Sequence, residues 1–461
     1  MRLVTIVCLL LSLSLSVVAQ RTPHAAIPRN AQSEKQKIFP YQYTIDDLPN
    51  GLRLVTIPTD FPNIVAVYTV VRAGSRNEIE RGKSGYAHLF EHLMFRGSEH
   101  YTPQERDAIL KRAGADDNAY TTDDRTVFHE VFSKEDLDKI LELNADTFQR
   151  LKYSPDAYKT ETKAVLGEFN KNSSNPTEKL FEVLRATAYR KHTYEHTTMG
   201  FIKDIEDMPN QYDYSLQFYQ RYYRPENVII TVVGDVQHDQ VLALVKKYFG
   251  DWRRGNYTPQ IPGEPAQTVA REEHIEWPSL TLPYVDVAFR GPAYSDTEVD
   301  HAALDLLQAY AFGENSDLYQ KLVLKEQKVD SLGTSFADRM DPELFYVETR
   351  VKDEKDLDYV RNEVLATYKR FTTELIPQDK LDATRSRLRY SFALSLDSSA
   401  AIAGTLASYI GLRGTPETVN KLYARYDRIT PEDIRAAAAK YFVDRNRTIV
   451  TLTSKSKGGA E

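Results

Sequence analysis

The chain has 461 residues, of which 41% are hydrophobic and 27% charged, and its net charge is −7. This length exceeds that of one ordinary hydrophobic core, so two or more domains are expected. The acidic balance, without a broad basic stripe, argues against nucleic-acid binding and gives no reason to expect binding to anionic membranes.

The first 19 residues are predicted to be a secretory signal peptide. Arg2 precedes an apolar run from Leu3 to Leu15, and small residues then offer a cleavage site before Gln20. A membrane anchor is the alternative, but a spanning helix needs about 20 apolar residues. Cys8, the only cysteine, would be removed with this segment. The prediction is an exported protein, periplasmic first and extracellular second, with no stable membrane insertion after cleavage.

Strand-like and helix-like stretches mix through the first domain, predicted over residues 37–253 after a flexible lead-in at 20–36. Apolar, β-branched runs predict strands at residues 52–57, 64–71 and 227–234. A helix is predicted from about Ser84 to Arg96, where Gly97 ends it. These elements follow no steady βαβ order, so the expected fold class is α+β.

The helix at residues 84–96 contains the sequence His88-Leu89-Phe90-Glu91-His92. His88 and His92 lie one turn apart on one helix face, where two imidazoles can bind the same metal ion. Glu91 lies beside them and can polarise a metal-bound water. The alternative is a pair of hydrogen-bonded core histidines. The apolar neighbours favour the metal, because a buried carboxylate beside two buried histidines needs a compensating charge.

A second helix begins at Ser154-Pro155, a typical helix start, and carries Glu161 and Glu168. These glutamates are seven residues apart and therefore on one face. A catalytic zinc takes three protein ligands, so one of the two glutamates can be the third ligand and the other can support the site. A solvated acidic face is the alternative. His192 and His196, farther on, lack helical pairing and are expected to be surface or structural residues.

Residues 254–280, rich in Pro and Gly, are predicted to be an interdomain linker. The second half then repeats the order of elements of the first, with a strand at 284–291, a helix at 300–311 and a strand at 448–452. A second, homologous domain is therefore predicted over residues 281–457, without zinc ligands.

Residues 74–78 and 85–98 closely resemble the pitrilysin (insulinase) family of zinc metallopeptidases, and residues 161–168 resemble its paired-glutamate helix. The resemblance implies one zinc ion per chain, held by His88, His92 and Glu168, with Glu161 in support. It also implies two α/β-sandwich-like domains that form half of a clamshell around short or unfolded peptides.

The segment from Asp117 to Phe132 resembles the family's active-site strand, whose edge takes up the substrate backbone. Asn118 and Ala119 are the matching positions, and Tyr120 is included in the predicted substrate-binding set. An ordinary strand start is the alternative.

The resemblance further implies a partner. Active relatives carry an Arg and a Tyr, seven apart, that contact the substrate and stabilise charge on the scissile carbonyl. Val323 and Asp330 stand at these positions here, unless the alignment has slipped or Arg339 or Tyr346 substitutes. The sequence thus predicts a zinc-dependent endopeptidase that works with a related second subunit supplying the pair, a heterodimer before a homodimer. The alternative is a non-catalytic or scaffolding subunit; a purely structural zinc site is less consistent with a mature chain that lacks cysteine.

Overall fold

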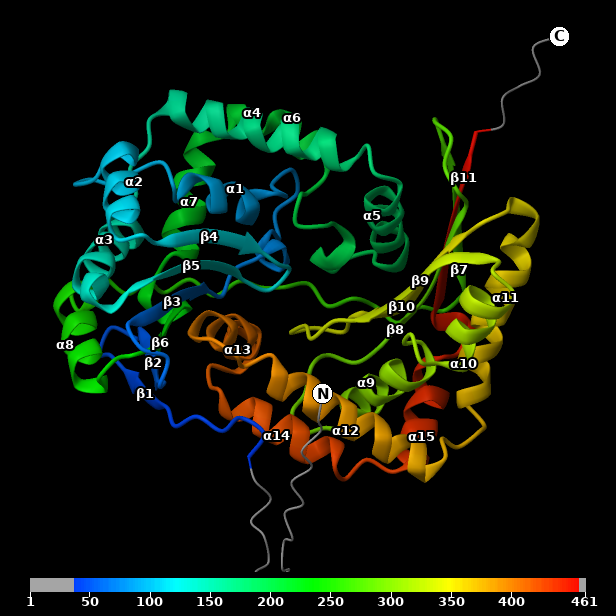
Figure 1. Cartoon of the computed structure of the whole chain (residues 1–461). Coiled ribbons are helices and arrows are strands. Elements are labelled where there is room, and N and C mark those ends of the chain that lie inside the picture. The colour runs from blue at the N-terminus through cyan, green and yellow to red at the C-terminus, as the bar shows by residue number, and fades with distance from the viewer. Residues whose placement is uncertain (1–36, 456–461) are drawn as a thin grey trace, which may run out of the picture. The chain divides into compact units, whose positions relative to one another are not determined.

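Two mixed β-sheets organise the residues described by the computed structural model, 37–455 (Figure 1). The predicted signal peptide and lead-in, residues 1–36, lie outside the described residues. The helices and strands from Ile38 onward belong to one structural unit. The α+β prediction is confirmed, since strands and helices mix without regular alternation. Among the described residues, no helix combines the length and apolar character needed to cross a bilayer.

The first sheet has six strands in the order β1-β2-β6-β3-β5-β4. β2 and β6 pair in parallel, whereas all other neighbours pair antiparallel. The central strands β3 and β6 are β-branched runs buried almost throughout, as a strand covered on both faces requires. The bounds are β1 Thr44–Asp47, β2 Arg53–Pro58, β3 Ile64–Val71, β4 Asp116–Thr121, β5 Thr126–Ser133 and β6 Val228–Gly234.

The second sheet repeats this topology without the first strand, in the order β7-β11-β8-β10-β9. Again one pair, β7 and β11, is parallel and the rest are antiparallel. The predicted repeat of the plan is therefore seen in strand order. The bounds are β7 Arg271–Trp277, β8 Tyr284–Arg290, β9 Val329–Phe336, β10 Leu344–Val351 and β11 Arg447–Ser454.

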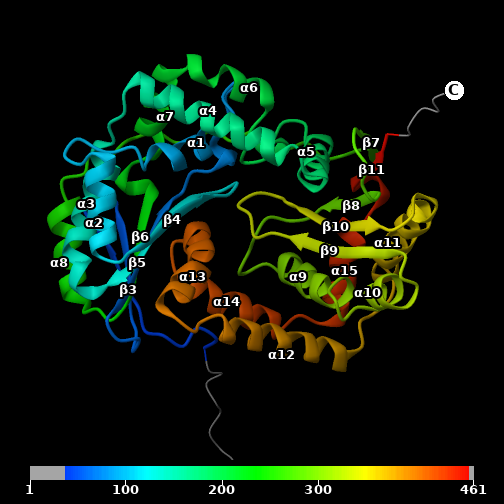
Figure 2. The ribbon, with the colours of Figure 1, turned by 45° about the horizontal axis from the view of Figure 1, so that its top comes forward.

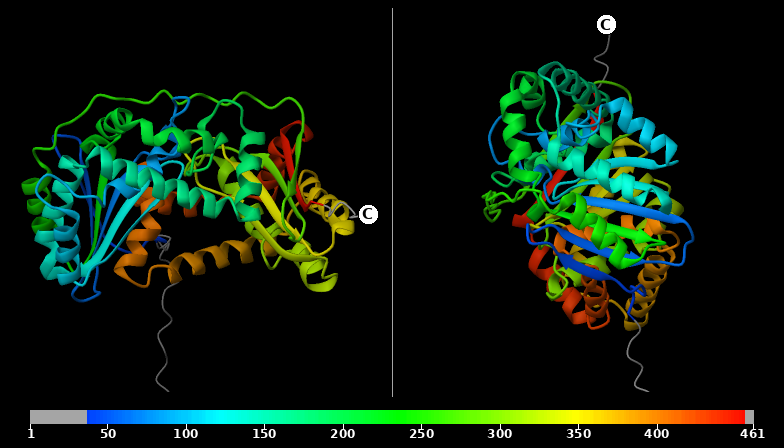
Figure 3. Two further views of the ribbon diagram at one scale, coloured as in Figure 1. Left: turned by 90° about the horizontal axis from the view of Figure 1, so that it is seen from above. Right: turned by 90° about the vertical axis from the view of Figure 1, so that its left-hand side faces the viewer.

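The predicted linker, residues 254–280, differs from the structure at its C-terminal end. Residues 254–270 form no helix or strand and run as extended chain (Figure 3, left). Residues 271–277, however, form β7, so the second sheet begins before residue 281. β7 is an edge strand with mostly exposed, charged side chains. It therefore lacks the apolar pattern by which strands are recognised in a sequence.

In the described residues, eight helices lie before the extended segment 254–270 and seven lie after it. The helices expected at residues 84–96, from 155 onward and at 300–311 are among them. The bounds are α1 Tyr86–Leu93, α2 Pro103–Arg112, α3 Leu137–Arg150, α4 Pro155–Asn172, α5 Pro176–Ala188, α6 Ile202–Asp207, α7 Tyr212–Tyr222, α8 His238–Phe249, α9 Val299–Ala311, α10 Asp317–Tyr319, α11 Leu357–Phe371, α12 Gln378–Leu394, α13 Ser399–Arg413, α14 Glu417–Tyr426 and α15 Pro431–Tyr441.

Each half of the chain covers the other half's sheet with one helix (Figures 1 and 2). α13, from the second half, packs on β3 and β6 of the first sheet, and α5, from the first half, packs on β7 and β11 of the second. α13 is rich in Ala, Gly and Ser, which lets it approach closely; a Cβ at Gly411 would lie 2.7 Å from Arg125 Cδ. Val70 of β3 and Leu406 of α13 belong to one hydrophobic core. The halves are thus joined by exchanged helices as well as by the linker.

A buried ion cluster also joins the halves. Asp123, in the β4–β5 turn, contacts Arg185 of α5 at 2.9 Å and Arg339 of the β9–β10 connection at 2.7 Å. Burial raises the pKa of Asp123, but the two guanidinium groups outweigh this effect and lower the pKa to about 2. The carboxylate is therefore ionised and paired on both sides.

Candidate metal centre

The helix α1, which carries the H-x-x-E-H motif, begins at a glycine held by a buried carboxylate. Gly85 has φ +86°, a left-handed conformation that favours glycine, and a Cβ there would lie 2.9 Å from the carbonyl oxygen of Met199. Glu78 accepts hydrogen bonds from the backbone N–H groups of Gly85 and Ala87, both at 2.7 Å. A carboxylate at this end satisfies N–H groups that the helix leaves free and fixes where the helix starts.

Three potential metal-binding atoms from α1 and α4 form a nearly equilateral triangle. His88 Nε2 and His92 Nε2 are 3.3 Å apart, and Glu168 Oε2 lies 3.6 Å from the first and 3.5 Å from the second. A tetrahedron with edges of this length has its centre about 2.1 Å from each corner, which is the length of Zn–N and Zn–O bonds. The arrangement of donor atoms therefore fits a zinc ion with three protein ligands and one open position.

The burial of the triangle is uneven. The His88 side chain is 9% exposed, whereas that of Glu168 is 40% exposed, so the group opens to solvent on the α4 side. Burial and the neighbouring His92 lower the pKa of His88, although Glu168 opposes them. A neutral imidazole is the form that binds a metal.

Glu161 lies behind the triangle and not in it. Its Oε2 is 3.7 Å from His92 Nδ1, and its Oε1 forms an ion pair of 2.7 Å with Arg96 Nε. A carboxylate at the second nitrogen of a metal-binding histidine orients the ring. Of the two glutamates left open by their spacing, Glu168 is thus at the ligand position and Glu161 at the supporting one. Sequence reasoning did not find Arg96, which anchors Glu161.

Glu91 points to the end of β4. Thr121, the last residue of that strand, donates a hydrogen bond of 2.7 Å from its hydroxyl to Glu91 Oε2. Burial raises the pKa of Glu91, while Thr121 and His92 oppose the shift. The carboxylate lies beside the triangle but is not part of it. Thr121 is a site residue that sequence reasoning missed, because its role depends on the contact between a strand end and a distant helix.

The three predicted substrate-binding residues all lie on β4, the last strand in its sheet's order. Asn118 is exposed, and its side-chain oxygen accepts from the N–H of Ala119, which is buried. Tyr120 is partly buried and packs against the hydrophobic core that includes Val70 and Leu406. The outer edge of β4 has no strand beside it in the described part of the chain, so its backbone is open to an extended peptide.

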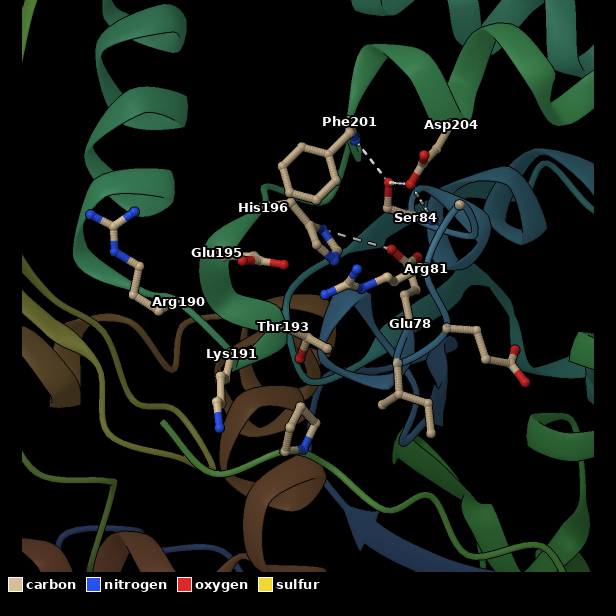
Figure 4. Close-up of a pocket in the computed structure, with 14 residues that line it drawn as sticks. Glu78, Arg81, Ser84, Arg190, Lys191, Thr193, Glu195, His196, Phe201 and Asp204 are labelled. Carbon is tan, nitrogen blue, oxygen red and sulfur yellow. Dashed lines mark hydrogen bonds and ion pairs between the residues drawn. The ribbon is translucent and has the colours of Figure 1, made fainter. Parts of the chain in front are cut away.

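A polar cavity of about 430 Å³ lies behind the N-terminus of α1 (Figure 4). Glu78, Ser84 and His196 line it, whereas the triangle residues do not. His192 and His196 are both buried: His192 Nε2 is 3.0 Å from Asp341, and His196 Nδ1 contacts the carbonyl of Thr197 at 2.9 Å. Their contacts are structural.

The two positions at which the resemblance implies an Arg and a Tyr provide no oxyanion donor. Val323 lies in the π-helical turn Gln320–Lys325, and Asp330 is on β9, where it pairs with Arg350 at 3.1 Å. Arg339 does not replace the missing arginine, because its guanidinium is engaged with Asp123. Tyr346 is on β10 and packs against Phe181 in the core between α5 and the second sheet.

Comparison with known proteins places this architecture in one family. The sequence model for insulinase (peptidase family M16) matches residues 53–201, and that for the peptidase M16 inactive domain matches residues 211–388. Zinc protease PqqE of Helicobacter pylori is 30% identical over 412 residues, covering 88% of this chain and 91% of that protein. The probable mitochondrial-processing peptidase subunit beta of Arabidopsis thaliana is 26% identical over 427 residues, covering 88% and 78%.

A solved structure agrees with these matches. The crystal structure of a protease from Helicobacter pylori superposes with a TM-score of 0.84 at 29% identity, covering 90% of this chain and 99% of that one. The chain therefore belongs to the insulinase (M16) family of peptidases, and the family predicted from its motifs is confirmed.

Proposed function

We propose that this protein is a zinc-dependent metalloendopeptidase that hydrolyses short or unfolded peptides inside a closed chamber. The observation that carries the proposal is the triangle of His88, His92 and Glu168, whose edges of 3.3–3.6 Å match the ligand spacing of a zinc ion. One zinc per chain is expected. Zinc in such a site supplies a Lewis acid that makes water nucleophilic at neutral pH and polarises a carbonyl.

The chain's own residues provide the remaining chemistry. Glu91 takes the proton of the attacking water on its carboxylate and then gives it to the leaving amine of the peptide. Thr121 fixes the orientation of that carboxylate through its 2.7 Å hydrogen bond. An extended substrate pairs with the open edge of β4 at Asn118–Tyr120, which sets the scissile bond in register with the helix α1.

The same proposal includes a second, related subunit. Val323 cannot donate a hydrogen bond and the Asp330 side chain offers an acceptor, so hydrogen-bond donors to the scissile carbonyl would have to come from elsewhere. A partner chain with the Arg and Tyr would supply it. A homodimer would lack the pair in both copies, which favours a heterodimer. The name of the plant relative, a subunit beta, supports a multi-chain arrangement.

The test is peptidase activity of the purified chain on an internally quenched peptide, alone and mixed with chains that co-purify from the native source. Activity should require the partner, disappear with a chelator and return with zinc. Full activity of the chain alone would refute the heterodimer but not the peptidase. No activity in any mixture, with zinc bound, would favour the rival function of a non-catalytic or scaffolding subunit.

We further propose that the protein is exported through residues 1–19 and works in the periplasm. The apolar run behind Arg2 motivates this proposal. The mass of the protein from its native compartment should correspond to a chain beginning near Gln20. A soluble cytoplasmic protein that retains Met1 would contradict export.

A further inference from the structure

The helix α9 occupies in the second half the place that α1 occupies in the first. Each helix follows the central strand of its sheet, β8 or β3, in the chain and comes before the hairpin at the sheet's edge, β9–β10 or β4–β5. When the residues are counted from the first residue of each helix, His301 corresponds to His88 and Asp305 to His92. The second half thus keeps two potential metal ligands four residues apart, on one helix face.

A third donor completes this group. Asp338 lies in the β9–β10 connection, and one ligand atom from each of His301, Asp305 and Asp338 falls within 4.8 Å of the others. His301 Nε2 is 3.0 Å from Asp338 Oδ1, and its Nδ1 is 3.7 Å from Asp305 Oδ2. Tyr426 donates a hydrogen bond of 2.6 Å to Asp305, which holds that carboxylate in place.

His301 is almost completely buried, at 1% exposure, and its two nitrogens lack satisfied hydrogen bonds. Neither nitrogen has a partner with hydrogen-bond geometry in the part of the chain that the structure describes, although Asp338 is close. Tyr294 and Phe336 pack against the ring, with centroids 5.0 and 5.2 Å away. Both nitrogens thus lie near carboxylates but outside hydrogen-bond geometry, and a buried imidazole in this position is costly unless a ligand satisfies it.

A cavity gives access to the group from solvent. Asp305 and Asp338 line a hollow of about 360 Å³ together with Tyr409, Tyr423 and Tyr426. The two aspartate side chains are 16% and 25% exposed, whereas His301 lies behind them. An ion can therefore reach the carboxylates first and then the imidazole, as a metal site requires.

We propose that His301, Asp305 and Asp338 bind a second divalent metal ion, distinct from the zinc of the first half and without a role in hydrolysis. One imidazole with two carboxylates suits a first-row transition metal such as Mn²⁺, which completes its coordination with water. Leu304 stands at the position of Glu91, so the helix offers no general base beside the ion. The ion would connect α9 to the β9–β10 connection, where Arg339 joins the two halves through Asp123.

The competing arrangement has no metal and a protonated His301 between the two aspartates. Metal counting distinguishes the two on the full chain. After removal of metals with a chelator, the His88→Ala/Glu168→Gln double variant, which lacks the first site, is titrated with Mn²⁺ and free Mn²⁺ is followed by electron paramagnetic resonance. We expect one bound Mn²⁺ per chain and a higher thermal midpoint with the ion present, because a ligand that binds only the folded state stabilises it.

The variant Asp338→Asn, added to this background, should weaken Mn²⁺ binding at least tenfold and abolish the thermal shift. Asp330→Asn is the matched control, since Asp330 is an exposed acid of β9 paired with Arg350, and it should change neither reading. The unaltered chain, loaded with Mn²⁺ and examined by native mass spectrometry, should hold two ions; this reading does not depend on any variant folding. One ion in the unaltered chain, none in the double variant, or equal binding by Asp338→Asn would overturn the proposal.

Discussion

The hydroxyl of Thr121 lies 2.7 Å from Oε2 of Glu91, so the end of the edge strand β4 is hydrogen-bonded to the helix that carries the metal-binding motif. This contact links the strand on which a peptide would dock to the proposed general base. It engages one oxygen of the carboxylate, Oε2. Several expectations about catalysis depend on it.

Replacing Thr121 with Val removes the donor while keeping the side chain's shape. We expect kcat to fall by roughly one to two orders of magnitude, because a hydrogen bond to a charged group contributes about 1.5–3 kcal/mol. Bound zinc should stay at one per chain. Thr121→Ser, which keeps the hydroxyl, should retain most activity. A Thr121→Val protein as active as its parent would show that the contact does not orient the base.

Replacing Glu91 with Gln should separate metal binding from turnover. Glu91 lies outside the triangle of metal-binding atoms, so zinc content should be unchanged. Turnover should fall by about 100-fold or more, since general-base catalysis typically contributes about 10²–10⁴-fold. Elemental analysis of the zinc content and steady-state kinetics, carried out on the same preparation, check both expectations. Hydrolysis at close to the parent rate would exclude the proposed mechanism.

The two glutamates of α4 should differ in their effect on zinc. Glu168→Gln and His88→Ala remove proposed ligands and should leave the purified protein nearly free of zinc. Glu161→Gln should only weaken zinc binding, by about 10- to 100-fold, because Glu161 contacts His92 and Arg96 behind the triangle. Zinc content after dialysis against a graded chelator series measures the difference. Stoichiometric zinc in Glu168→Gln together with loss in Glu161→Gln would reverse the assignment.

Local patterns in the sequence predicted the core strands and the helices α1 and α4, which carry the candidate metal ligands. β3 and β6 are rich in β-branched residues, and Ser154 caps α4 by accepting from the N–H of Ala157 at 3.1 Å, as its position before Pro155 suggests. β7 was missed because an exposed edge strand of charged residues has no apolar alternation. The covering of one half's sheet by the other half's helix was also missed, since no local pattern in α13 specifies its partner.

In the candidate site, spacing alone left Glu161 and Glu168 equivalent. Their positions differ because the packing of α4 on α1 brings Glu168 near both Nε2 atoms and Glu161 near Nδ1 of His92. Thr121 and Arg96 act through contacts with residues that are distant in the sequence or on another helix, and their residue types carry no signal. Such contacts become visible only when the elements are assembled.

Replacing Asp123 should lower the stability of the folded protein strongly. Asp123→Asn would remove the ionised partner of the buried Arg185 and would leave Arg339 with a longer ion-pair contact of 3.7 Å to Glu343. Loss of one partner of a buried ion pair costs about 3–5 kcal/mol, so a clear fall in the thermal midpoint is expected. The exposed pair of Asp330 serves as control, and Asp330→Asn should cost at most about 1 kcal/mol. Equal effects of the two variants would contradict this account.

Glu130 predicts a pH dependence of stability. It is buried in β5, where burial raises its pKa from 4.5 to about 7, although Arg106 and a hydrogen bond from Asn144 oppose the shift. The folded chain thus keeps this proton to a higher pH than the unfolded chain. Protonated Glu130 therefore contributes fully to the free energy of unfolding below about pH 4.5. This contribution is lost as the pH rises to about 7, which lowers the free energy of unfolding by roughly 3 kcal/mol.

Glu130→Gln is neutral at every pH and should therefore gain stability relative to the parent between pH 5 and pH 8. Thermal midpoints of both proteins, measured side by side across this range, give the difference. Glu135→Gln, at an exposed position of the same region, should show no such trend. A parent-to-variant difference that is flat with pH would mean that Glu130 is ionised in the folded protein throughout.

The exchange of α5 and α13 between the two sheets limits how this protein can move. Swinging one half away from the other would pull α13 off β3 and β6 and α5 off β7 and β11, which would expose two hydrophobic cores to water at once. We therefore expect the two halves of a single chain to move together as one rigid body. If the proposed second subunit encloses a chamber with this chain, a peptide would enter at the interface between the two subunits, and the opening rate would depend on contacts between subunits rather than on the 254–270 segment.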